Sequence, residues 1–213
     1  MSRRRVLVGA LALLLAGCSS SSADLPAGSE LVAKSASAMR SVTSTHFTIK
    51  VDGELPNVSV KDAEGDLNAE GESKGRAKVE QFGQLLEVEY VLVDQDLYFK
   101  GPTGGFNKLP AALAGQLYDP TAILDPDKGV AKVLASAKDA RTVSADDGGH
   151  VVEATVPKDV VAGLVPGIDA DVKSRFSLKD DRLTDAVFEL PSGAKVTITL
   201  SDFNKSFTVA PPT

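Results

Sequence analysis

The alternation of apolar and polar side chains predicts that most of this chain forms β-strands. Between His46 and Asp52, Phe47, Ile49 and Val51 alternate with polar residues, which is the period of a strand with one buried and one solvated face. The first five segments of this kind have connections too short for crossovers, so we expect an antiparallel meander. The expected strands are residues 46–52, 58–69, 76–80, 85–93, 97–100, 141–146, 150–156, 172–179, 184–190 and 195–201.

Four other segments carry the signals of short helices. Residues 29–41 have apolar side chains at helical spacing behind Ser29, a good N-cap residue. In the Pro- and Gly-containing stretch that follows the fifth strand, Asp119–Pro120 and Asp125–Pro126 each have the form of a cap followed by a first helical residue. A fourth helix is expected over residues 157–165, beginning at its proline.

These elements predict one α+β domain over residues 28–213. An antiparallel sheet with one apolar face has to cover that face, and the helices are available to do so, so the sheet is expected to curl around them. Its inward side chains are small or medium, such as Ala77 and Val79 on one strand and Leu86 and Val88 on the next, and the chain has no Trp. Two alternatives therefore stay open: an interior filled by the helices, or an unfilled apolar cavity.

The N-terminus carries the signal of a bacterial lipoprotein. Three consecutive arginines ending at Arg5 precede an apolar run that is too short to span a membrane. The sequence Leu-Ala-Gly-Cys18 follows, with small residues where a signal peptidase would cut before the only cysteine. We predict that residues 1–17 are a removed signal peptide, that Cys18 is the diacylglycerol-modified N-terminus, and that the Ser-rich residues 18–27 are a flexible tether.

Charge and cysteine content exclude several classes of function. Removing residues 1–17 removes three of the 23 basic side chains and leaves 29 acidic ones, a formal net charge of −9. A surface this acidic is repelled by nucleic acid and by anionic headgroups. We therefore expect no nucleic-acid partner, and the acyl chains on Cys18 have to hold the protein at the extracytoplasmic face of the plasma membrane. With Cys18 lipidated, disulfides, thiolate metal sites and a cysteine nucleophile are excluded.

The remaining residues offer little chemistry for catalysis. Gly71-Glu-Ser73-Lys-Gly75 matches the G-x-S-x-G pattern of hydrolases, but that chemistry needs a strand before the serine, a helix after it and a histidine base. Strands are expected on both sides, so a polar hairpin turn is the favoured interpretation. The two histidines, His46 and His150, are too few for a three-histidine zinc site and are expected at the surface. Phosphate-binding and dinucleotide motifs do not occur in the sequence, and we expect no metal, no cofactor and no enzymatic activity.

The second predicted helical region contains the longest stretch that is similar to a known protein family. Tyr118-Asp-Pro-Thr-Ala-Ile-Leu-Asp-Pro-Asp-Lys-Gly-Val-Ala-Lys-Val-Leu-Ala135 resembles the Y-D-x-x-x-(I/V)-L-(D/N)-P-x-x-G-(L/V)-A-x-V-L-A segment of the mycobacterial LppX/LprG-type lipoproteins (LppX, LprA, LprF and LprG). Shorter similarities are Gly65-Asp66-Leu67, Asn107-Lys108 and the closing Val196-Thr-Ile-Thr-Leu-Ser201. The resemblance covers nearly the whole chain after the signal.

The resemblance implies a fold and a cargo. The fold is a single strongly curved antiparallel sheet, a half-barrel, with helices on its concave face enclosing an apolar cavity. The cargo is acylated lipid or glycolipid, including triacylated and triacylglycerol-like lipids, carried from the plasma membrane outward, in some members beside a major-facilitator-type exporter. Gln81 departs from the family pattern, which often has an apolar residue there. The positions expected to line the cavity are Phe47, Ile49, Val51, Ala77, Val79, Leu86, Val88, Tyr90, Ile123, Leu124, Val130, Val133 and Leu134.

Two other functions stay open beside this one. A membrane-anchored adaptor or binding protein would have a filled core and no lipid cargo. A hydrolase using Ser73 would turn over esters and lose that activity in Ser73→Ala. Lipid extraction of the non-acylated protein separates the carrier from both.

Overall fold

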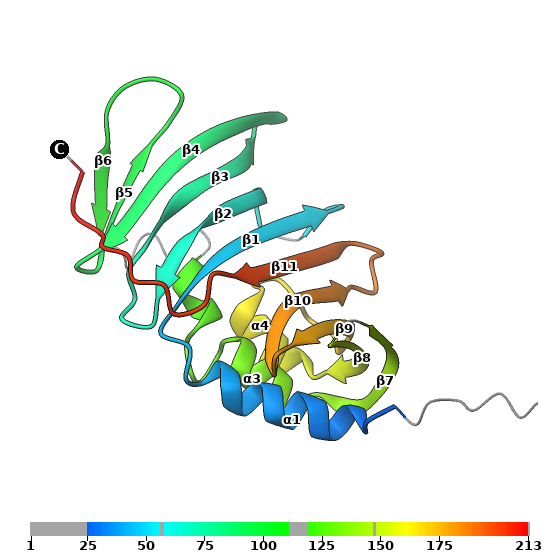
Figure 1. Cartoon of the computed structure of the whole chain (residues 1–213). Coiled ribbons are helices and arrows are strands. Elements are labelled where there is room, and N and C mark those ends of the chain that lie inside the picture. The colour runs from blue at the N-terminus through cyan, green and yellow to red at the C-terminus, as the bar shows by residue number, and fades with distance from the viewer. Residues whose placement is uncertain (1–24, 56–57, 111–118, 147, 213) are drawn as a thin grey trace, which may run out of the picture.

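The computed structural model describes residues 25–55, 58–110, 119–146 and 148–212, and it consists of one large sheet with a few short helices (Figure 1). The predicted signal peptide and Cys18 lie outside these residues. The strands are β1 (Ser44–Asp52), β2 (Val60–Asn68), β3 (Ser73–Gln81), β4 (Gln84–Val93), β5 (Asp96–Lys100), β6 (Asn107–Pro110), β7 (Lys138–Asp146), β8 (Gly149–Val156), β9 (Val172–Lys179), β10 (Arg182–Glu189) and β11 (Lys195–Ser201).

All neighbouring strands of this sheet are antiparallel, in the order β6-β5-β4-β3-β2-β1-β11-β10-β9-β8-β7. Two hairpin meanders, β1–β6 and β7–β11, are joined where the first strand pairs with the last, with Phe47 opposite Leu200. The sheet is bent and does not close (Figure 1). The predicted fold class, an α+β domain built on one curved antiparallel sheet, is confirmed.

The helical segments in the described part of the chain are α1 (Gly28–Met39), the 3₁₀ helix η1 (Pro120–Ile123), α3 (Val130–Ala135) and α4 (Lys158–Leu164). Helix α1 packs on α3 and on β7, β8 and β10. It approaches β7 so closely that a Cβ atom on Gly28 would lie 2.6 Å from the backbone nitrogen of Arg141, a separation that only glycine permits. The helices therefore gather on the β7–β11 half of the sheet (Figure 1).

Several local predictions were wrong. Asp125–Pro126 does not begin a helix: Asp125 accepts hydrogen bonds from the backbone nitrogens of Asp127 and Lys128 in a turn, and α3 starts only at Val130, with Gly129 as its N-cap. Ser29 does not cap α1: the N-cap position is Ala27, without a side-chain hydrogen bond, because the helix begins one residue earlier, at the glycine that fits against β7. The Gly71–Gly75 turn ends at residue 72, and Ser73 is already the first residue of β3. Strand β6 was not expected, since proline and glycine residues flank it; it pairs with β5, with Leu109 opposite Leu97.

The covered half of the sheet contains a filled core. The rings of Phe176 and Phe188 meet edge to face, with centroids 6.4 Å apart and planes at 77°. Ile123, Val133 and Leu134 reach the same cluster from the helical side and are fully buried. Each large aliphatic side chain buried in this way stabilises the fold by about 1.5–3 kcal/mol relative to an exposed one. This half of the molecule therefore supplies much of the stability.

The other half of the sheet is covered incompletely. On β3, β4 and β5 the inward side chains remain half-buried, in contrast to the fully buried ones of β9 and β10. Among the described residues, no helix is long and apolar enough to cross a membrane. As far as the described residues show, the inner face of β2–β5 is where the structure leaves space.

Candidate functional site

An apolar groove of about 570 Å³ runs along the inner face of β2–β5. Its wall on the side opposite the sheet is formed in part by the loop after β5 and by the start of η1, where Asp119 and Pro120 line it. Among the described helices, η1 alone contributes to this lining. The lining residues are Ser59, Val60, Ala63, Ala77, Val79, Glu80, Gln81, Leu86, Val88, Tyr90, Leu92, Leu97, Phe99, Gly101, Pro102, Asp119 and Pro120.

The inner end of the groove is formed by Tyr90 and its contacts. Ser73, which is fully buried, donates a hydrogen bond from Oγ to the backbone oxygen of Asp66 (3.0 Å) and lies 3.1 Å from the Tyr90 hydroxyl. With its own proton directed at Asp66, Ser73 accepts from the phenol. Burial is the largest cause that raises the pKa of Tyr90 above its ordinary value, so the phenol stays neutral near pH 7 and presents an uncharged wall.

The opposite end of the groove opens to solvent. Its lining there, at the hairpin and loop ends of β3 and β5, consists of exposed residues: Glu80, Gln81 and Pro102. Glu80 forms an ion pair of 3.1 Å with Lys61, which neutralises the charge at this rim. Gln81, the departure from the family pattern, therefore lies at the polar rim of the groove and not in its apolar interior.

The start of η1 is shaped by a local cap. Asp119 accepts hydrogen bonds from the backbone nitrogen of Thr121 (2.9 Å) and from its hydroxyl (2.7 Å), and Pro120 is buried at the first helical position. This confirms the Asp119–Pro120 helix start. Asp119 itself is exposed, so its carboxylate also meets solvent at the edge of the groove.

Five of the positions expected to line a cavity are brought together here: Ala77, Val79, Leu86, Val88 and Tyr90. The other eight do not line this groove and pack in or against the filled core. Six of these are fully or almost fully buried: Phe47, Ile49, Ile123, Val130, Val133 and Leu134. The remaining two, Val51 and Leu124, are partly buried and pack against it. The strand residues that line the apolar groove thus all belong to the first meander.

Several lining residues were missed by the sequence reasoning, among them Val60, Ala63, Leu97 and Phe99. Leu97 and Phe99 alternate on the predicted strand 97–100, and their inward direction follows once Tyr90 is opposite Phe99 in the β4–β5 register. The alternation shows that Leu97 and Phe99 share one face of the strand, but the pairing of β4 with β5 is needed to identify that face as the inner one.

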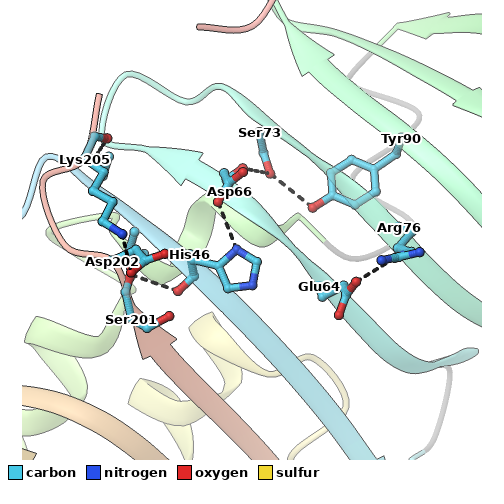
Figure 2. A network of polar contacts seen from close by, with 11 residues as sticks. His46, Glu64, Asp66, Ser73, Arg76, Tyr90, Ser201, Asp202 and Lys205 are labelled. Atoms are coloured by element: carbon cyan, nitrogen blue, oxygen red, sulfur yellow. Dashed lines mark hydrogen bonds and ion pairs between the residues drawn. The ribbon is translucent and has the colours of Figure 1, made fainter. Parts of the chain in front are cut away.

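The structure does not assemble a hydrolase triad around Ser73. His46 Nδ1 lies 2.9 Å from the Asp66 carboxylate, and Figure 2 shows this pair beside the Ser73–Tyr90 contact. However, His46 is the register partner of Asp66, whereas Ser73 is the partner of Leu67. Adjacent positions of β2 point to opposite faces, so the imidazole and the Ser73 hydroxyl lie on different sides of the sheet.

Metal chemistry has no site in the described part of the chain, where no three His, Cys, Asp or Glu side chains gather. His46 and Asp66 instead belong to the solvated outer face. Lys205 and Asp202 form an ion pair nearby (Figure 2). The chemistry that the arrangement offers is therefore the burial of apolar groups in the groove.

An open antiparallel sheet with this arrangement is the fold of solved mycobacterial lipoproteins. The structure is similar to that of LprF from Mycobacterium bovis, with a TM-score of 0.76, 21% identity, and coverage of 87% of this chain and 96% of that one. It is also similar to that of LppX from Mycobacterium tuberculosis, with a TM-score of 0.63, 17% identity, and coverage of 85% and 97%. The chain belongs to the LppX_LprAFG lipoprotein family, whose model matches residues 27–209.

A relative with a functional name supports the same assignment. The lipoarabinomannan carrier protein LprG of Mycolicibacterium smegmatis is 34% identical over 97% of this chain and 93% of its own length. The resemblance seen between residues 118 and 135 is thereby confirmed as family membership.

Proposed function

We propose that this protein is a cell-envelope lipid carrier that binds acylated lipids or glycolipids in the groove on β2–β5. The observation that carries the proposal is the groove itself: about 570 Å³ of apolar space bounded by half-buried side chains. This volume is within the range of small-molecule sites, about 300–1,000 Å³. The carrier name of the Mycolicibacterium smegmatis relative supports the same function.

The energetics suit a carrier. Each buried methylene contributes about 0.8 kcal/mol, so a long acyl chain gains on the order of 10 kcal/mol over water. Release into water would be very slow, and delivery would take place at a membrane or a partner protein. Two acyl chains on Cys18 would hold the protein at the extracytoplasmic face of the plasma membrane, where triacylated or triacylglycerol-like lipids could be loaded and passed outward, with a major-facilitator-type exporter as a candidate partner.

The proposal includes no catalytic step. Ser73 is committed to Asp66 and Tyr90, and the neighbouring His46 lies on the other face of the sheet, so the hydrolase alternative loses its support. The adaptor alternative differs from the carrier in one measurable respect, the amount of lipid that is held without a covalent bond.

The test measures co-purifying lipid in the full chain with Cys18→Ser, secreted from a mycobacterial host. Chloroform extraction and mass spectrometry should recover acylated lipid from this protein. Ala77→Trp and Val79→Trp, which fill the groove, should each reduce that lipid by roughly tenfold or more. Lys78→Trp is the matched control, because Lys78 is exposed between them on the same strand, and it should retain the lipid. Absence of lipid from the parent protein, or equal recovery from all variants, would count against the carrier.

A further inference from the structure

The turn between β3 and β4 presents large apolar side chains to solvent. Phe82 is 98% exposed and Leu85 is 63% exposed. Among the described residues, the other exposed large apolar side chains are Leu25, at 41%, and Val143, at 40%. Two of four such residues therefore stand within one tight turn, where an apolar patch is a marker of an interaction site.

The backbone of this turn is an unusual place for an aromatic residue. Phe82 has φ of 52° and Gly83 has φ of 74°, the left-handed pair that a two-residue hairpin turn requires. Asn, Asp or Gly satisfies this conformation more readily than a bulky side chain. The fold thus holds Phe82 in a strained conformation without gaining any burial from it.

The exposed turn continues the strands that form the groove. Glu80 and Gln81, directly before Phe82, line the groove at its open end, and Leu86, directly after Leu85, lines its wall. In Figure 1 the β3–β4 turn stands at one end of the sheet, away from the C-terminal segment. Whatever contacts Phe82 and Leu85 is therefore next to the opening of the groove.

The charge around the turn suits contact with a lipid surface. The six residues from Gln81 to Leu86 carry no charge. Carboxylates near the turn include Glu80, which is paired with Lys61, and Glu54, which lines a polar pocket together with Phe82 and Gly83. The tip itself is uncharged, so its apolar side chains would make the contact with headgroups, and Lys61 offsets part of the acidic charge behind them.

We propose that the β3–β4 turn inserts Phe82 and Leu85 into the headgroup and acyl boundary of a phospholipid bilayer, which brings the open end of the groove onto the membrane. This inference rests on the proposed carrier function. The predicted tether, residues 18–27, would span at most about 35 Å when fully extended. A domain held so close to a bilayer has a high effective concentration at its surface, so a small apolar tip is sufficient for repeated docking.

Insertion can be read out with a single fluorophore, because the chain has no Trp. Phe82→Trp in the full chain with Cys18→Ser is mixed with protein-free vesicles of phosphatidylcholine and phosphatidylglycerol. Its emission should shift to the blue and be quenched by lipids with brominated acyl chains. Val143→Trp, on the edge strand β7, is the matched exposed control and should respond to neither. An unchanged Phe82→Trp spectrum on vesicles would overturn the proposal, and docking only in the presence of a membrane protein would do the same.

The second measurement is transfer of a pyrene-labelled diacylglycerol between vesicles. The double variant Phe82→Ser/Leu85→Ser should slow transfer by roughly tenfold, with co-purifying lipid equal to that of the parent. Unchanged transfer would overturn the proposal. Insertion and groove binding can be tested separately. In Ala77→Trp/Phe82→Tyr, the protein should lose its co-purifying lipid but should still co-sediment with vesicles. If the carrier function alone were wrong, the parent protein would contain no lipid, but the emission of Phe82→Trp would still shift to the blue on vesicles.

Discussion

Gly65 and Gly75 are register partners on β2 and β3, and the Tyr90 hydroxyl lies 2.9 Å from the position that a Cβ atom would take on either of them. The phenol thus lies over a strip of bare backbone. Phe47 on one side and Tyr90 on the other are the next residues in the same cross-strand row. The two glycines thus leave the space that the Tyr90 hydroxyl occupies.

Gly75→Ala should lower the free energy of unfolding by about 1–3 kcal/mol, the usual cost of overpacking. The added methyl would overlap the backbone oxygen of Glu64 and press on Tyr90. Chemical denaturation gives the difference. Gly105→Ala is the control, since a Cβ there meets nothing within 4 Å, and it should be nearly neutral. Equal stability of the two variants would contradict the close packing over β2 and β3.

Tyr90 should make the protein less stable at alkaline pH. Burial raises its pKa in the folded state above the ordinary 10.0, so as pH rises past 10.0 the unfolded chain releases this proton while the folded protein retains it, and stability falls. Tyr90→Phe should unfold with a weaker pH dependence between about pH 9 and 11. Phenolate absorbance during titration provides a second measurement. The absorbance change that is present in the parent and absent in Tyr90→Phe belongs to Tyr90, and it should occur above pH 10.0. If this change occurred at the ordinary tyrosine pKa, the buried environment of Tyr90 would be contradicted.

A matched pair of leucines distinguishes the filled core from the groove. Leu134 is 1% exposed and packs in the core, so Leu134→Ala should cost about 2–5 kcal/mol of unfolding free energy. Leu86 is only half-buried on the groove wall, and Leu86→Ala should cost about 1 kcal/mol. Urea unfolding of the lipid-free protein measures both. If Leu86→Ala were the more costly change, the two halves of the sheet would not differ as described.

Glu153 should contribute stability that is lost in acid. Hydrogen bonds from Arg141 (3.1 Å) and Arg175 (2.7 Å) lower the pKa of its carboxyl group. A lowered pKa adds stability above the ordinary glutamate range and loses it as pH falls through the folded value. Glu153→Gln should therefore melt slightly earlier than the parent at pH 7, and the two melting temperatures should converge below about pH 4. Because these side chains are in contact with solvent, high salt should also reduce the difference in melting temperature between the parent and Glu153→Gln. A difference in melting temperature that did not depend on pH would contradict the charge of Glu153 as its cause.

The sequence pattern was sufficient for the local elements but not for their assembly. The alternation around Phe47 predicts a strand, and the structure extends it by only two residues to β1. The pairing of β1 with β11 has no local signal, since it joins residues about 150 positions apart, as Phe47 and Leu200 do. Ser29 was a reasonable cap by type, but the close approach of Gly28 to β7 decides where α1 begins.

The candidate site could be predicted only in part for a similar reason. Val79 and Leu134 both lie on apolar faces, and the alternation shows that a face avoids water without showing what covers it. Leu134 is covered by protein, whereas Val79 faces open space. The exposure of Phe82 follows from a turn conformation that its residue type does not favour, so no propensity argument would have placed it there.

The junction of the two meanders has a consequence for how such a chain could be exported. The strand that joins them, β11, ends at residue 201 of 213, so the sheet cannot be completed until nearly the whole chain has emerged. A polypeptide threaded from its N-terminus, as the predicted signal implies, would leave β1 without its second neighbour throughout translocation. Such late completion would favour assembly of the finished sheet only after translocation.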